Sequence, residues 1–119
     1  MKVTIGNTDI KVKLAVTPEA IRNGMQKKRF DEDYQGMFFL MPSKQEQSFW
    51  MFDCIIPLDI IFIDGDTITT IHSDCPPCEN ELECESYRGF GDKVLEIAGG
   101  SSEQLGIKKG DKVSFSLFN

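Results

Sequence analysis

Residues 49–63 read FWMFDCIIPLDIIFI, a nearly continuous apolar stretch that contains two carboxylates, Asp53 and Asp59, and one proline, Pro57. An apolar run of this kind predicts a buried segment at the centre of a hydrophobic core. An unpaired carboxylate is costly to bury, so each acid must be hydrogen-bonded, ion-paired or placed at a surface that its apolar neighbours only partly cover. The stretch is therefore both the centre of the predicted fold and the first place to look for a site.

Size and charge limit the class of protein. A chain of 119 residues fits one domain, which we take as residues 1–119. The net charge of −6 argues against a nucleic-acid binder, which needs a basic surface to replace counterions. The first ten residues lack the apolar segment of a signal peptide, and residues 55–63 are too short to cross a membrane. We expect a cytoplasmic protein with neither nucleic-acid nor membrane partners.

The alternation of apolar and polar side chains predicts a mainly β protein. Residues 2–5 and 10–16 alternate on either side of the turn residues 6–9, which predicts a β-hairpin. Further strands are predicted at 36–41, 48–52, 57–63, 67–72, 94–98 and 112–118, with Pro42 ending the first of them and an irregular segment over 73–91.

Two short helices are predicted among these strands. Thr17, Pro18 and Glu19 provide an N-cap, a first-turn proline and a first-turn acid, and Gly24 ends that helix after Asn23. A second, one-turn helix follows Gly99-Gly100, with Ser101 and Gln104 spaced as a capping box and Gly106 as its terminator. About eight strands with two short helices predict an antiparallel β barrel or distorted sandwich, because closure removes exposed edges.

Several separated motifs share their order and spacing with one known family. They are Thr17 to Gly24, Gly36-Met-Phe-Phe39, Phe49-Trp-Met51, Ile56-Pro-Leu-Asp-Ile-Ile-Phe-Ile-Asp64, Val94-Leu-Glu96, Gly99-Gly100 and Gly106-Ile107 with Gly110-Asp111. On these motifs residues 10–115 resemble the DUF192 (UPF0127) family of small prokaryotic and phage-carried β proteins of unknown function. The resemblance implies a compact β domain and no established activity.

This chain also differs from the family pattern. Relatives usually read Trp-Met-Lys-Asn-Thr where this sequence has Trp50-Met51-Phe52-Asp53-Cys54, and Lys28 stands in the place of a family arginine. If those family residues contact an anionic ligand, this chain has lost part of that contact, because Phe52 and Asp53 stand where relatives have lysine and asparagine.

The predicted binding site consists of Trp50, Asp53, Asp59, Lys28 and Glu96, next to the 24–36 loop. In this interpretation Trp50 forms a wall, and Asp59 fixes polar groups of a ligand. A structural interpretation is equally open: Trp50 belongs to the core, and Asp59 accepts backbone N–H bonds that brace a turn. Glu96 is likewise either a site residue or an ordinary strand residue.

Three functions remain open. The leading hypothesis is a non-enzymatic module that binds an unknown small molecule or protein at a shallow site near Trp50 and Asp59. The first alternative is a small hydrolase or isomerase that uses Asp59 and Glu96 as an acid/base couple. The second is an interaction or assembly module. No nucleophile motif or phosphate-binding loop is present in the sequence, so no catalytic residue and no cofactor are predicted.

Cysteines cluster after the central stretch, with His72, Cys75, Cys78 and Cys84 lying within thirteen residues. Such spacing is compatible with a disulfide, with a zinc site formed by all four residues, or with free thiols. The family resemblance implies a Cys78–Cys84 disulfide, because relatives often carry a cysteine pair in this loop. Cys54, inside the apolar stretch, is expected to be a buried free thiol.

Overall fold

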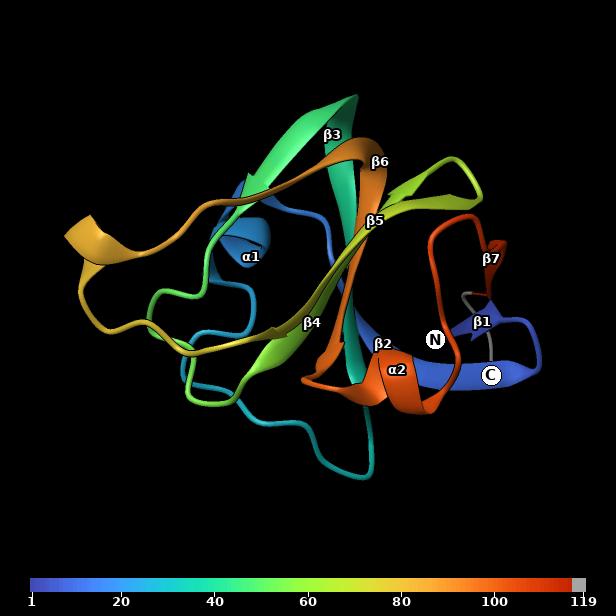
Figure 1. Ribbon diagram of the computed structural model, residues 1–119, viewed down its shortest axis with the longest axis horizontal. Coiled ribbons are helices and arrows are strands. Elements are labelled where there is room, and N and C mark those ends of the chain that lie inside the picture. The colour runs from blue at the N-terminus through green and yellow to red at the C-terminus, as the bar shows by residue number, and fades with distance from the viewer. Residues whose placement is uncertain (117–119) are drawn as a thin grey trace.

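The computed structural model describes residues 1–116, which form one curled seven-stranded sheet (Figure 1). The strands are β1 (Lys2–Ile5), β2 (Thr8–Ala15), β3 (Gly36–Phe49), β4 (Leu58–Asp64), β5 (Thr67–Cys75), β6 (Tyr87–Ala98) and β7 (Val113–Ser116). Their order across the sheet is β5-β4-β6-β3-β2-β1-β7. The prediction of a mainly β fold is confirmed.

The sheet is mixed and forms a half-barrel, so the prediction of a closed antiparallel barrel or sandwich is wrong. β2 and β3 pair in parallel, whereas the other neighbouring strands are antiparallel. Parallel neighbours need a crossover connection, and the segment that contains α1 provides it. The two outer edges meet at the start of β5, where an isolated bridge joins Thr67 and Lys112. Backbone hydrogen bonds on either side of it run from the Val113 N–H to the Asp66 carbonyl (2.7 Å) and from the Ile68 N–H to the Asp111 carbonyl (3.0 Å).

Strand β3 is longer than the sequence predicts, because Pro42 does not end it. The pairing of β3 with β6 shifts register between Leu40 and Gln45. Pro42 lies in this irregular part of the ladder, where its missing N–H is tolerated. Residues 36–41 and 48–49 therefore belong to one strand, and β6 begins at Tyr87 inside the segment predicted to be irregular. Residues 117 and 118 of the predicted last strand lie outside the described residues.

The first helix, α1 (Pro18–Asn23), has the predicted ends. The Thr17 hydroxyl oxygen accepts a 3.1 Å bond from the Ala20 N–H, and Gly24 ends the helix with a φ of 45°. Figure 1 shows α1 on the side of the sheet away from β1 and β7.

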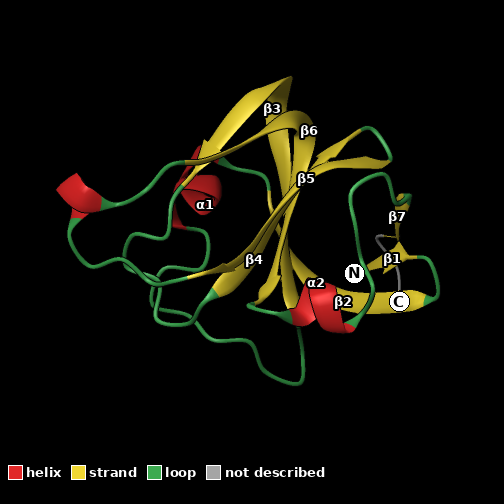
Figure 2. Cartoon of the chain, viewed as in Figure 1, coloured by secondary structure: helices red, strands yellow, loops and turns green. Residues whose placement is uncertain are grey.

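The second helix, α2 (Ser101–Gln104), begins after Gly100, and the predicted capping box is wrong because its N-cap makes no side-chain bond. A third short element, the 3₁₀ helix η1 (Glu81–Glu83), sits at the end of a long excursion away from the sheet (Figure 2).

Two apolar clusters cover the two faces of the sheet. Successive side chains of a strand point to opposite faces, so the neighbours Phe38 and Phe39 enter different clusters. The Phe38 core contains Val3, Ile5, Ile10, Val12, Phe38, Ile61, Ile63, Ile68, Leu95, Ile97, Ile107 and Val113. The Phe39 core contains Ala15, Met25, Tyr34, Met37, Phe39, Met51, Cys54, Leu58, Ile60, Phe62, Cys75 and Val94, with Ala20 and Ile21 of α1 packed against it.

Asp59 on β4 is fully buried and is the most heavily hydrogen-bonded side chain of the sheet. One carboxylate oxygen accepts the N–H groups of Asp74 (2.7 Å) and Gly100 (2.9 Å). The other accepts the N–H (2.8 Å) and the hydroxyl (2.6 Å) of Ser102. Gly100 adopts a φ of 88° to present its N–H. Asp59 therefore ties the end of β5 and the start of α2 to β4.

We predict that Asp59→Asn lowers the free energy of unfolding by about 2–4 kcal/mol. In wild type both side-chain oxygens accept hydrogen bonds, whereas the amide of asparagine would place an NH₂ donor group opposite donors in place of one of them. Chemical denaturation measures this. The matched control is Asp66→Asn, whose side chain is 71% exposed and bonds only to Thr67 and Lys112. A loss for Asp59→Asn no larger than that of the control would contradict the role of this carboxylate.

Candidate functional site

A cavity of about 270 Å³ opens on the Phe39 face of the sheet. It lies between α1, the β3 strand and the segment 50–54 that follows β3. Its walls are mainly apolar and aromatic. The lining residues are Ile21, Arg22, Asn23, Gly24, Met25, Gln26, Phe39, Met41, Ser48, Phe49, Trp50, Phe52, Cys54 and Glu96.

Aromatic rings form much of this wall. The rings of Trp50 and Phe52 lie 5.2 Å apart between centroids, and those of Phe39 and Phe49 meet edge to face at 5.0 Å. Trp50 is 37% exposed, so it stands at the opening of the cavity and not in the core. As the single tryptophan of the chain, it is also an intrinsic fluorescent reporter of the cavity.

Among the described residues that line the cavity, Glu96 is the one acid. It sits on β6 between Met37 of β3 and Ile60 of β4, and only 3% of its surface is exposed. Within residues 1–116 its carboxyl group has no hydrogen-bond or ion-pair partner. Burial raises the pKa of this carboxyl to about 8. Glu96 therefore keeps its proton at neutral pH, as a neutral acid in an apolar wall.

Two buried thiols lie near Glu96, and both are un-ionised at neutral pH. Burial raises the pKa of Cys54, which lines the cavity, to about 12, with smaller contributions in the same direction from Glu96 and Asp53. Burial likewise raises the pKa of Cys75 to about 11. Since the thiolate is the reactive form, neither thiol is an activated nucleophile.

Asp59 and Glu96 lie on opposite faces of the sheet. Asp59 pairs with Ile97 of the Phe38 core, whereas Glu96 pairs with Ile60 of the Phe39 core. Directly opposed residues of antiparallel strands point to the same face, so the two carboxyls point away from each other. The acid/base couple of the enzymatic hypothesis is therefore not assembled.

Lys28 and Asp53 lie beside the cavity without lining it. The Lys28 ammonium donates a 3.0 Å bond to the carbonyl of Gly24, and its charge acts on Cys54. Asp53 adopts a φ of 63° and forms a 3.5 Å ion pair with Lys27. Of the five residues predicted for the site, the structure brings Trp50 and Glu96 together at the cavity, places Lys28 and Asp53 next to it, and places Asp59 on the other face.

Sequence reasoning missed the contribution of α1 and of the second half of β3. Ile21 and Arg22 reach the cavity because α1 packs on the Phe39 core. Met41 and Ser48, on either side of Pro42, line it together because β3 is one strand from Gly36 to Phe49. The apolar pair Ala20-Ile21 on a short helix was the available signal that α1 covers part of the sheet.

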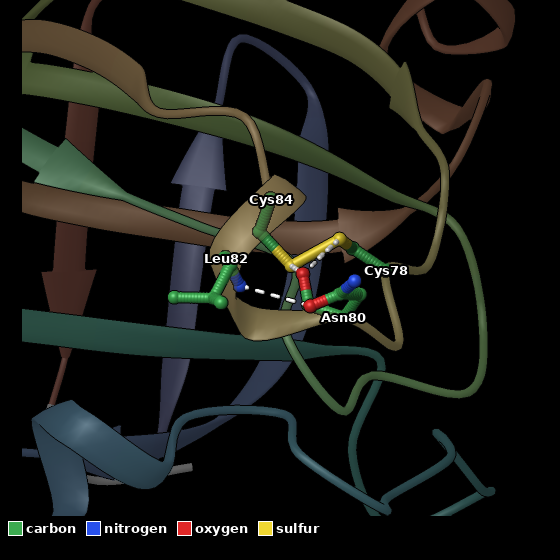
Figure 3. Close-up of a disulfide and its surroundings, with 4 residues drawn as sticks. All are labelled: Cys78, Asn80, Leu82 and Cys84. Atoms are coloured by element: carbon green, nitrogen blue, oxygen red, sulfur yellow. Dashed lines mark hydrogen bonds between the residues drawn. A yellow bond between two sulfur atoms is a disulfide. The ribbon is translucent and has the colours of Figure 1, made fainter.

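The cysteine-rich excursion contains a disulfide between Cys78 and Cys84 (Figure 3), whose Cα atoms lie 5.7 Å apart. Within the bridged loop the Asn80 side-chain oxygen accepts a 3.1 Å bond from the Leu82 N–H. Cys54 and Cys75 are buried free cysteines.

The alternative zinc site is not formed in this arrangement. His72 packs on Tyr87, and its Nε2 lies 2.8 Å from the carbonyl of Arg88, while Cys78 and Cys84 bond to each other. In the part of the chain that the structure describes, no three His, Cys, Asp or Glu side chains are grouped so as to hold a metal ion.

The disulfide loop also supports the cavity wall. The Asp53 N–H donates a 2.9 Å bond to the Cys78 carbonyl, and the Cys78 N–H donates a 3.2 Å bond to the Met51 carbonyl. These bonds hold the backbone of the segment that carries Trp50, Phe52 and Cys54.

The fold and the cavity define a small β domain with a curled mixed sheet and a single buried acid in an aromatic pocket. The chain belongs to the DUF192 family, described as "Uncharacterized ACR, COG1430", which matches residues 1–115. The predicted family membership is therefore confirmed. None of the curated proteins matches this sequence.

Two solved structures share the fold. One is a protein of unknown function from Novosphingobium aromaticivorans, which is 32% identical with a TM-score of 0.82, over 96% of this chain and 84% of that one. The other, from Sinorhizobium meliloti, is described as a "putative transcription regulator" and is 29% identical with a TM-score of 0.82, over 95% of this chain and 91% of that one. Across residues 1–116, no helix has the length and apolar character needed to cross a membrane.

We predict that stability falls as pH rises between about 4.5 and 8. Below 4.5 Glu96 is protonated in both states. Between 4.5, the ordinary pKa, and 8, the folded protein keeps a proton that the unfolded chain has lost. The free energy of unfolding then drops by up to about 1.4 kcal/mol per pH unit, and this change ends above pH 8. Denaturation at several pH values measures the slope.

The control for this slope is Glu96→Gln, which has nearly the same shape but no proton to lose. The difference between wild type and Glu96→Gln isolates Glu96 from the other carboxyls. Those with a lowered pKa, such as Asp92, titrate below this window. Equal slopes for the two proteins would contradict a neutral Glu96 in the folded state.

We further predict that two thiols react in the unreduced, denatured protein and four after reduction, because Cys78 and Cys84 are bonded. In the native protein Cys54 and Cys75 should label slowly, since both are buried and un-ionised. Replacing both bridged cysteines by serine should lower the free energy of unfolding by about 2–3 kcal/mol. Four reactive thiols before reduction would rule out the disulfide.

Proposed function

We propose that this protein is a non-enzymatic binding domain whose cavity on the Phe39 face takes a small molecule. One observation carries the proposal: the buried Glu96 carboxyl faces a cavity of about 270 Å³ without a hydrogen-bond partner among residues 1–116. Of the residues predicted for the site, the proposal keeps Trp50 and Glu96. It places the ligand in a cavity, whereas the sequence predicted a shallow surface site.

Energetics support a ligand at this position. Buried polar groups in proteins are nearly always hydrogen-bonded, and the Glu96 carboxyl has its open side toward the cavity. A ligand that bonds to the Glu96 carboxyl supplies the partner that the protein does not, and contact with the rings of Trp50, Phe52 and Phe49 adds apolar burial. A pocket with apolar walls and a few placed polar groups is the usual form of a small-molecule site.

The enzymatic hypothesis has less support. Asp59 already accepts four hydrogen bonds on the far face, and Cys54 is held as a neutral thiol. Neither is available to Glu96 as a catalytic partner. The third hypothesis, an interaction or assembly module, stays a prediction.

A regulatory role for this domain would fit ligand binding better than direct DNA contact. The similar structure from Sinorhizobium meliloti is described as a "putative transcription regulator". A net charge of −6 disfavours direct contact with phosphates. If this chain serves regulation, sensing a small molecule in the cavity is the role that its charge and shape favour.

We predict that hits from a small-fragment library change Trp50 fluorescence and shift the backbone amide signals of residues 50–54. A compound present at a free concentration ten times its dissociation constant should raise the free energy of unfolding by about 1 kcal/mol. This raises the melting temperature by a few degrees. Glu96→Leu should weaken the polar hits, and Trp50→Ala should weaken hits of every kind.

The control for this screen is Leu105→Ala in a second, more polar cavity of about 360 Å³ that Ile5, Gly6 and Lys112 also line. It should leave every hit unchanged. Hits that depend on Leu105 and not on Glu96 or Trp50, or a library without a single hit in the first cavity, would refute the proposed site.

A further inference from the structure

We propose that the cavity selects small, uncharged, planar ligands that present an amide-like edge, a carbonyl acceptor beside an N–H donor, to Glu96. This inference rests on the proposed function and specifies the ligand class of the same site. Simple amides, lactams and nitrogen heterocycles with such an edge belong to this class.

The protonation state of Glu96 determines which groups it can recognise. A neutral carboxyl offers an O–H donor and a carbonyl acceptor next to each other, whereas a carboxylate offers acceptors only. An amide-like edge presents the matching acceptor and donor, so the pair forms two hydrogen bonds. Burial is the sole cause of the raised pKa of Glu96, so no neighbouring cation offsets the cost of ionising it.

The charges around the cavity disfavour a cationic ligand. Arg22 lines the cavity, and Lys28 sits against the Gly24 carbonyl at its edge. Asp53, which follows the lining residue Phe52, is paired with Lys27. Among the described residues Glu96 is the one acid of the lining. A cation would meet repulsion at the opening and would need Glu96 to ionise inside an apolar wall.

The size and walls of the cavity favour a flat ring. Its volume of about 270 Å³ holds one small substituted ring and not an extended molecule. Trp50 and Phe52 at the opening, and Phe39 and Phe49 deeper in, offer ring faces and edges for stacking.

A pH titration of binding can be assigned to Glu96. Cys54 and Cys75 interact electrostatically with Glu96, and Arg22 lines the same cavity. Lys28 and Asp53 act on Cys54 from beside the cavity. The pKa values of Cys54 and Cys75 are raised to about 12 and about 11, so both thiols stay neutral between pH 6.5 and 9. A change in affinity inside this window therefore reports on the Glu96 proton.

Four probes of nearly equal size test the inference: benzamide, toluene, benzylamine and benzoate. Affinities at pH 6.5 are measured by Trp50 fluorescence and by amide shifts of residues 50–54. We expect benzamide to bind at least about fivefold more tightly than toluene, the ratio that a net hydrogen bond provides. Benzylamine and benzoate should bind less tightly than benzamide. For wild type, benzamide affinity should fall about tenfold between pH 7 and pH 9.

Two variants separate hydrogen bonding from structural damage. Glu96→Gln keeps a donor and an acceptor but cannot ionise, so it should bind benzamide with an affinity that does not change with pH. Glu96→Leu keeps the apolar wall and should bind benzamide and toluene equally well. Toluene affinity that stays constant across all three proteins shows that the cavity itself is intact.

The possible failures are distinguishable. If toluene or benzylamine binds in the cavity as tightly as benzamide, the ligand class is wrong while the binding function stands. Binding of benzylamine that strengthens as pH rises through 8 would point to an ionised Glu96 and a cationic ligand. If none of the four probes shifts residues 50–54, both the ligand class and the proposed function are overturned.

Discussion

The carboxylate of Asp59 is the interaction on which the arrangement of this domain depends. From β4 it accepts four hydrogen bonds, from Asp74, Gly100 and Ser102, and so fixes the end of β5 and the start of α2 on one strand. A Cβ atom at position 99 would clash with an Asp74 carboxylate oxygen, which explains the glycine there. The register of β4 against β6 that this network holds pairs Asp59 with Ile97, and the same register turns Glu96 to the opposite face. The anchor of the fold thereby also sets the position of the site.

The two buried acids of the sheet differ in what surrounds them. Asp59 has every hydrogen-bond donor that a carboxylate needs, which makes it a structural residue. Glu96 is 3% exposed and has no partner among the described residues, and burial raises the pKa of its carboxyl to about 8, so it keeps its proton at neutral pH. Because natural proteins tend to break local rules at functional sites, the carboxyl without a protein partner, and not the fully hydrogen-bonded one, is where we propose that a ligand binds.

Short sequence motifs were enough to predict elements that form within one short segment of the chain, such as α1 and β4. Thr17, Pro18 and Gly24 predicted both ends of α1, and the central apolar stretch predicted β4. Whether Asp59 within it is a site residue or a structural one was left open by the sequence. The passage of β3 through Pro42 could not be predicted, because it depends on a register shift against β6, a strand more than forty residues away. The parallel pairing of β2 with β3 depends in the same way on the crossover through α1. Alternation along a strand does not show which face of the sheet a helix covers. Trp50 could therefore be assigned to the site from the sequence, whereas Arg22 of α1 could not.

The account depends most on the state of one carboxyl group. A ¹³C NMR titration of the Glu96 side-chain carboxyl carbon reports its ionisation directly, without unfolding the protein. We predict a midpoint near pH 8, which moves higher when benzamide is bound, because the bound ligand favours the protonated acid. A midpoint close to the ordinary glutamate value of 4.5, with or without ligand, would contradict the central claim that Glu96 is a neutral hydrogen-bonding group facing a ligand cavity.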